Sequence, residues 1–144
     1  MKTTLLAVSL CLACATMTAQ AASPAQPAAA TPAARAYIIS PHDGATVPRT
    51  FTVRFGLSGM GVAPAGIVYK NTGHHHLLID VATLPAAGQP IPADARHRHF
   101  GGGQSETTLT LAPGTHTLRL ELGDAHHMPF NPPIVSQAIT VHVE

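Results

Sequence analysis

Apolar and polar residues alternate in several short segments of the chain. The alternation runs through residues 51–57, 118–122 and 139–143, where Phe, Val, Leu or Ile stands at every second position. Successive side chains of a β-strand point to opposite faces, so this pattern predicts strands with one buried and one solvent-facing side. Residues 37–40 and 107–111 are two shorter candidates of the same kind.

Residues 75–84 follow a different pattern, because their apolar side chains occupy both alternating positions. Such a strand is buried on both faces, which predicts a place at the centre of a sheet. Turn residues separate the candidate strands, at Pro41–Gly44, Pro113–Gly114 and the glycine triplet 101–103. They leave little room for helices, and Pro113–Gly114 predicts a hairpin between the strands on either side of it.

The six or seven short strands predict an all-β fold. We expect a small antiparallel β-sandwich, immunoglobulin-like in outline, with long Pro/Gly-rich loops. The loops lie at 58–73, 85–104 and 123–133. Loops on a rigid sandwich commonly carry function, so they are the first places to look for a site.

The N-terminus has the features of an export signal. Lys2 precedes an apolar run from Leu5 to Met17, which is too short to cross a bilayer, and Ala19-Gln20-Ala21 is a small-x-small cleavage site. We therefore expect a periplasmic or secreted protein. Its predicted parts are a signal peptide at 1–21, a flexible Ala/Pro linker at 22–35 and the sandwich domain at 36–144.

Both cysteines, Cys11 and Cys14, lie inside the predicted signal peptide, so a mature domain would have no thiol. Leu12-Ala13-Cys14 partly resembles a lipobox, which leaves a lipid anchor at Cys14 as the alternative to simple cleavage. The formal net charge is +1 without a run of like charges, which argues against a nucleic-acid partner. Outside the signal, no hydrophobic stretch of the sequence is long enough to span a membrane.

Histidine is the candidate chemistry of this chain, with 10 of 144 residues. His74, His75 and His76 run into the predicted central strand, and His97-Arg98-His99 follows later. Imidazole is neutral near pH 7 and is the commonest protein ligand for transition metals. Residues i and i+2 of a strand share a face, so His74 and His76 can converge on one ion, as can His97 with His99.

One histidine pair does not complete a tetrahedral site, and the segment from Asp124 to Met128 offers further donors. His126, His127 and Met128 are candidates there, and Met60 is a second thioether. Mixed His and Met donors favour copper, whereas His with Asp favours zinc. Our predicted metal ligands are His74, His76, His97, His99, His127 and Met128.

Other polar residues have structural interpretations. His75 is in phase with the apolar residues that follow, so we expect it at the core edge with a hydrogen bond to backbone. His116 is in phase with Leu118, which favours a buried, hydrogen-bonded structural role. Asp80 would either orient an imidazole of the His74/His76 face or pair with Arg96 or Arg98. We interpret the glycine triplet as a tight turn.

Four blocks of sequence resemble a known family. They are residues 53–66, 71–80, 99–107 and the stretch from 113 to 133, with HHHLLID, HFGGGQ and PGTHTL as their cores. Together they resemble the bacterial exported domain-of-unknown-function family forty-three ninety-nine. The resemblance implies a small secreted or periplasmic domain without a settled activity. The chain departs from it at Ala125 and Phe130, where many members have His, which weakens the case for ligands in that loop.

These observations support three hypotheses. The leading one is an exported, non-enzymatic domain that coordinates a transition-metal ion, copper before zinc, for carriage or storage. The second is a non-catalytic envelope module that contacts another protein, in which the histidines form an internal hydrogen-bond network. The third is a metal-dependent hydrolase with Glu106 as general base, although no nucleophile motif accompanies it.

Overall fold

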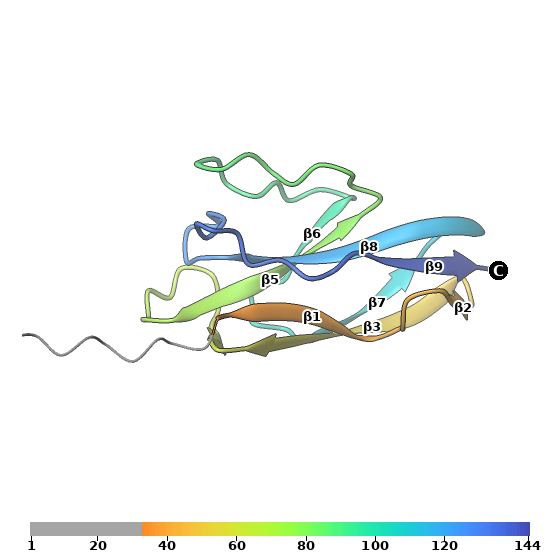
Figure 1. Cartoon of the computed structure of the whole chain (residues 1–144), viewed down its shortest axis with the longest axis horizontal. Coiled ribbons are helices and arrows are strands. Elements are labelled where there is room, and N and C mark those ends of the chain that lie inside the picture. Colours follow the sequence, from red (N-terminus) through yellow and green to blue (C-terminus); the bar gives the residue numbers. More distant parts are fainter. Residues whose placement is uncertain (1–32) are drawn as a thin grey trace, which may run out of the picture.

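The computed structural model describes residues 33–144, and they form two β-sheets packed face to face (Figure 1). The smaller sheet has the order β1 (Arg35–Ser40), β3 (Thr50–Ser58), β7 (Glu106–Thr110). The larger has the order β2 (Ala45–Val47), β9 (Ile139–Val143), β8 (Gly114–Gly123), β5 (Thr72–Ile79), β4 (Gly61–Val62), and β6 (His97–His99) also pairs with β5. This confirms the all-β, sandwich-like prediction. The predicted signal peptide, Cys11, Cys14 and most of the predicted linker lie outside the described residues.

The core lies between the two sheets and contains the apolar residues of the alternating segments. Val53 and Leu109 come from the smaller sheet, and Leu118, Leu120 and Val141 come from the larger; each is at most 1% exposed. The period-two pattern therefore assigned the buried face of each strand correctly. The described part of the chain is built of strands and loops and contains no helix long and apolar enough to cross a membrane.

The predicted hairpin around Pro113–Gly114 is wrong. β7 pairs with β3 in one sheet, whereas β8 pairs with β5 and β9 in the other. Leu109 and Leu118 face the same core from opposite sides, so the chain crosses between the layers at residues 111–113. Two of the strand pairs, β2 with β9 and β4 with β5, are parallel, although we expected an antiparallel arrangement throughout.

β5 is the central strand that its sequence predicts, buried over residues 73–79. It begins at Thr72, earlier than expected, and ends at Ile79 because Asp80 adopts a left-handed conformation with φ 54. β8 flanks it on one side, and β4 and β6 pair with it as well. This position lets β5 display one set of side chains to the core and another to the far side of the sheet.

The outer face of the larger sheet, away from β1 and β3, is covered by two long loops. Figure 1 shows the loop 80–96 (green) and the first part of the loop after β8 (blue) on this side, whereas residues 134–136 pair with β8 along the edge of the sheet. Ile91, which is 3% exposed, donates its backbone N–H to the carbonyl of His127 and so joins the two loops. Consequently His74, His76 and Leu78 are as deeply buried as the core residues between them.

Candidate metal centre

Four imidazoles gather on the covered face of the larger sheet. The ring centroid of His74 lies 4.9 Å from that of His76, 5.0 Å from His99 and 5.1 Å from His127. His99 lies 4.7 Å from His127 and 5.1 Å from His76, and the longest separation, His76 to His127, is 6.1 Å. These four residues are the histidine cluster of the following sections.

The sheet register sets three of the four rings. His74 and His76 share a face because they are two residues apart in β5, and His99 of β6 is the cross-strand partner of His76. Directly opposed residues of an antiparallel pair have Cβ atoms about 4.5–5.5 Å apart, so the pairing alone brings His99 beside His76. The one-apart spacing in the sequence thus becomes a compact group of rings.

His127 joins the histidine cluster from a turn that Asp124 organises. The Asp124 Oδ1 accepts hydrogen bonds from the backbone N–H groups of His126 (2.8 Å) and Met128 (2.9 Å). The backbone N–H of His127 donates to the carbonyl of Asp124, and His127 itself has a φ of 65. This left-handed position points the imidazole back toward β5, while the neighbouring His126 is exposed.

Two glycines leave the space that the rings occupy. A Cβ at Gly123 would lie 2.8 Å from Cε1 of His76, and one at Gly101 would lie 2.3 Å from Cε1 of His99. Gly101 belongs to the glycine triplet, which forms the expected turn, with Gly103 donating its N–H to the carbonyl of Phe100. The triplet therefore does more than reverse the chain, because its first member makes room for a cluster ring.

His74, His99 and His127 have ring nitrogens spaced for a metal ion. One nitrogen from each lies within 4.8 Å of the other two. The Nε2 atoms of His99 and His127 are 3.1 Å apart. Two imidazole nitrogens bound to one tetrahedral zinc, each at roughly 2.0–2.1 Å, would be about 3.3 Å from each other. A modest rotation of His74 would complete a three-nitrogen set.

His76 and Glu121 lie deeper on the same face and are both fully buried. They are cross-strand partners between β5 and β8. Within the described residues, neither ring nitrogen of His76, neither ring nitrogen of His74 and neither carboxylate oxygen of Glu121 has a hydrogen-bond partner. Buried polar atoms are paired in the great majority of cases, so this concentration of unpaired atoms in one place requires an explanation.

The surroundings keep three of the cluster rings neutral: His74, His76 and His99. Burial, together with the neighbouring His99 and His127, lowers the pKa of His74 from 6.5 to about 4. Burial and the other cluster rings lower the pKa of His76 to about 3, and burial followed by His127 lowers the pKa of His99. Neutral imidazole is the form that coordinates a metal, so these rings are ligation-competent at neutral pH.

The remaining predicted ligands lie elsewhere. His97 is on β6 opposite Leu78, and its Nδ1 lies 3.0 Å from the Asp94 carboxylate, so it is outside the group of His74, His99 and His127. Met128 contributes backbone contacts to the Asp124 turn. Metal ligation by either residue stays a prediction.

The structural roles predicted for His116, Asp80 and His75 agree with the structure to different degrees. His116 is hydrogen-bonded through both ring nitrogens, to Asp80 (2.7 Å) and to the carbonyl of Ala112 (2.9 Å), although it is only partly buried. Asp80 therefore serves His116 and the backbone of Thr117, and it does not orient a ring of the His74/His76 face. His75 packs against Phe55 at 5.4 Å, and its Nδ1 has no partner in the described part of the chain. The expected backbone hydrogen bond is thus absent at that atom.

Glu121 was not among the residues predicted from sequence. Its place in the alternating segment 118–122 indicated a solvent-facing side chain. That inference assumed an open outer face, but the face is covered by the two loops. The sequence did contain one indication that Glu121 is buried, which is the apolar pattern on both faces of the neighbouring strand β5. Loops that cover one central strand also cover the strand beside it.

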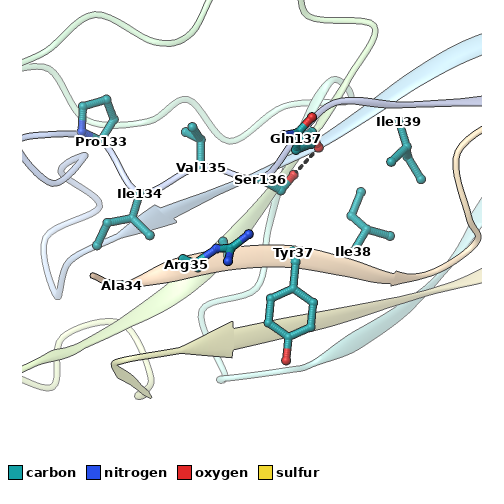
Figure 2. Close-up of a pocket in the computed structure, with 11 residues that line it drawn as sticks. Ala34, Arg35, Tyr37, Ile38, Pro133, Ile134, Val135, Ser136, Gln137 and Ile139 are labelled. Atoms are coloured by element: carbon teal, nitrogen blue, oxygen red, sulfur yellow. Dashed lines mark hydrogen bonds between the residues drawn. The ribbon is translucent and has the colours of Figure 1, made fainter. Parts of the chain in front are cut away.

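A separate cavity of about 430 Å³ lies at the open edge of the sandwich, between β1 and residues 133–139 (Figure 2). Its lining combines apolar side chains with polar groups, Arg35 is its charged member, and Ser136 donates a hydrogen bond to the carbonyl of Gln137 there. Tyr37 points away from residues 133–139 in this view, and its ring lies over Gly56 on the outer side of β3. This cavity is distinct from the histidine cluster.

Comparison with known proteins gives one match. The family model described as Domain of unknown function (DUF4399) matches residues 53–144, a range that contains the whole histidine cluster and Glu121. The match supports the resemblance to a bacterial family of this kind. No curated protein and no solved structure matches the chain.

Proposed function

The chain belongs to this family of domains of unknown function, and we propose that it is an exported protein that binds a transition-metal ion, copper before zinc, for carriage or storage. The observation that carries the proposal is the histidine cluster: four imidazoles from three segments, with ring centroids 4.7–6.1 Å apart.

A metal ion would satisfy atoms that the protein leaves unpaired. Burying a polar group without a partner costs roughly 1–3 kcal/mol, and His74 and His76 together bring four such nitrogens into the interior. A bound ion would accept a lone pair from one nitrogen of each ring. The Nε2 atoms of His99 and His127 form a hydrogen bond with each other, and at 3.1 Å they are also close enough to bind one ion.

The alternative, an envelope module with an internal histidine network, requires hydrogen-bonded ring nitrogens. A histidine in such a network has its ring nitrogens hydrogen-bonded to the protein, as His116 does. His74 and His76 lack these bonds within the described residues, so they do not fit the pattern that His116 exemplifies. This contrast favours metal binding for the cluster and a structural role for His116.

We propose binding rather than catalysis. The hydrolase hypothesis needs Glu106 near the metal as general base, but Glu106 lies on β7 of the opposite sheet. There it forms an exposed ion pair with Arg54 at 3.2 Å. The best candidate base is therefore on the wrong side of the sandwich.

Calorimetric titration of the purified protein with Cu(II), Zn(II) and, under anaerobic conditions, Cu(I) tests the proposal. The double variant His99→Ala/His127→Ala removes two cluster rings that come from outside the central strand, so the fold should survive. We expect its affinity for the preferred ion to fall at least about 100-fold, since even residues behind the ligands are worth 10–100-fold.

The matched control is His42→Ala/His142→Ala, which removes two exposed histidines outside the cluster and should bind like the unmodified protein. Equal affinities for the two double variants would contradict the proposal. Export rests on the sequence of residues 1–21 alone, and the mass of the protein recovered from periplasmic extracts tests it. A chain beginning at Ala22 is expected, and a lipid-modified Cys14 would replace cleavage there with anchoring.

A further inference from the structure

Glu121 is the most isolated charge-bearing group in the described part of the chain. Its side chain is fully buried, and neither carboxylate oxygen has a hydrogen-bond partner. Arg119 and His97 are the nearby groups that favour its charged form, but neither forms an ion pair with it. An uncompensated buried carboxylate costs several kcal/mol, and native proteins rarely keep one without a purpose.

The register places Glu121 beside the histidine cluster. It is the cross-strand partner of His76, so the two Cβ atoms should be about 4.5–5.5 Å apart on the covered face. Gly123, two residues along β8 on the same face, lies opposite His74, and its missing side chain leaves room for the His76 ring. Glu121 and His76 are thus cross-strand neighbours on one buried face, and both carry unpaired polar atoms.

We infer that Glu121 and His76 supply the inner ligands of the metal site, and that the site consequently takes a divalent ion, Zn(II) or Cu(II), in preference to Cu(I). This inference rests on the proposed metal-binding function and adds an anionic oxygen to a ligand set predicted from histidines and a methionine. His74, His99 and His127 would provide the outer nitrogen donors.

The donor chemistry carries the preference. Imidazole together with carboxylate suits zinc and Cu(II), whereas Cu(I) is selected by the soft sulfur of Cys or Met. A carboxylate also compensates a divalent charge that neutral imidazoles cannot, and in a buried site that compensation has a large effect. The ion in turn provides the partner that Glu121 lacks.

The variant Glu121→Gln removes the charge with little change in shape. Affinities for Zn(II), Cu(II) and Cu(I) are measured for it by chelator competition, beside the unmodified protein and the control Glu106→Gln. We expect Zn(II) and Cu(II) to bind at least about 10-fold more weakly to Glu121→Gln, with Cu(I) affinity unchanged within error. Glu106 is exposed on the other sheet, so its variant should bind all three ions normally.

The outcomes separate this inference from the proposed function. Unchanged Zn(II) and Cu(II) affinity in Glu121→Gln, or an equal loss for Cu(I), would overturn the inference while leaving the histidine site intact. If no ion binds the unmodified protein, the proposed function fails and the inference fails with it.

A measurement on the unmodified protein covers the case in which Glu121→Gln does not fold. Infrared difference spectra recorded on addition of Zn(II) should show a shift of a carboxylate band, because a carboxylate changes its stretching frequency on coordination. The same shift should occur in Glu106→Gln. A spectrum with only imidazole bands would overturn the role of Glu121.

Discussion

His74, His75 and His76 are adjacent in sequence and enter two different environments. Strand alternation sends His75 toward Phe55 in the core, and it sends the other two to the covered outer face. All three are buried, and burial is the first cause of the lowered pKa of each: about 4 for His74 and His75 and about 3 for His76. The three residues thus affect stability alike although their surroundings differ.

The stability of the metal-free protein should fall as the pH is lowered from 6.5 to about 4. In this range the unfolded chain binds protons at these histidines and the folded chain does not, so acid favours unfolding. Each histidine contributes a slope of up to about 1.4 kcal/mol per pH unit. Glu121 acts in the opposite direction, because burial raises its pKa from 4.5 to about 6, but it is one group against three.

Urea unfolding at a series of pH values measures this slope. His75→Leu should remove about a third of the slope that the three histidines produce, and it should leave metal affinity unchanged. The exposed His42, changed to Ala, should leave the slope as it is. A free energy of unfolding that is flat between pH 6.5 and 4 would contradict the burial of neutral imidazoles.

At the scale of the elements, the features that could be predicted from sequence are concentrated in β5. Its doubly apolar pattern indicated a central strand, and the one-apart histidines indicated a shared face. Both follow from the local geometry of a single strand. The hairpin prediction failed because Pro113–Gly114 signals a turn and does not specify whether the next strand joins the same sheet or crosses to the other.

The contributions of His127 and Glu121 could not be assigned in the same way. His127 reaches the cluster through the Asp124 turn and a φ of 65, and Glu121 is enclosed by loops that its own alternating pattern does not reveal. Neither feature is visible in the residue's own segment, and only the pattern of the neighbouring strand β5 pointed to the burial of Glu121. The sequence did point to His127 as a ligand candidate, but by residue type alone.

Gly101 and Gly123 should control metal affinity although neither residue supplies a ligand. A methyl group at either position would push a cluster ring aside, at His99 or His76 respectively. We expect Gly101→Ala and Gly123→Ala to weaken binding by roughly 10–100-fold, while the free energy of unfolding changes by no more than about 1 kcal/mol. Calorimetry and urea unfolding on the same samples give the two quantities.

Gly61→Ala is the control for this pair. Its added Cβ would come no closer than 3.4 Å to a neighbour, Cγ2 of Thr72. Its metal affinity should therefore match that of the unmodified protein. Normal affinity in Gly101→Ala and Gly123→Ala would mean that the observed ring positions are not those used for binding.

At the scale of the whole molecule, the domain is a two-sheet sandwich with a layer of loops over its outer face. The ion would connect this layer to the sheet, since His127 belongs to a loop and His74 to β5. Binding energy should consequently appear as folding energy. An excess of free ion 100 times the dissociation constant should raise the free energy of unfolding by about 2.7 kcal/mol.

Thermal or urea unfolding with and without the preferred ion tests this coupling. A strong chelator should reverse the stabilisation, and His99→Ala/His127→Ala should show none. Stability that responds to neither ion nor chelator would instead favour the envelope module with an internal histidine network.

The histidines of the cluster differ in exposure, and this difference affects how a bound metal ion would leave the site. His74 is fully enclosed, while His99 sits at the surface on a three-residue strand. An acceptor could therefore coordinate the ion from the side of His99 while the buried histidines still bind it. The ion would then be transferred through an intermediate in which both proteins are ligands, without release into solution. The rate at which the protein releases the ion would then increase with the concentration of the acceptor, as expected for direct transfer between two proteins.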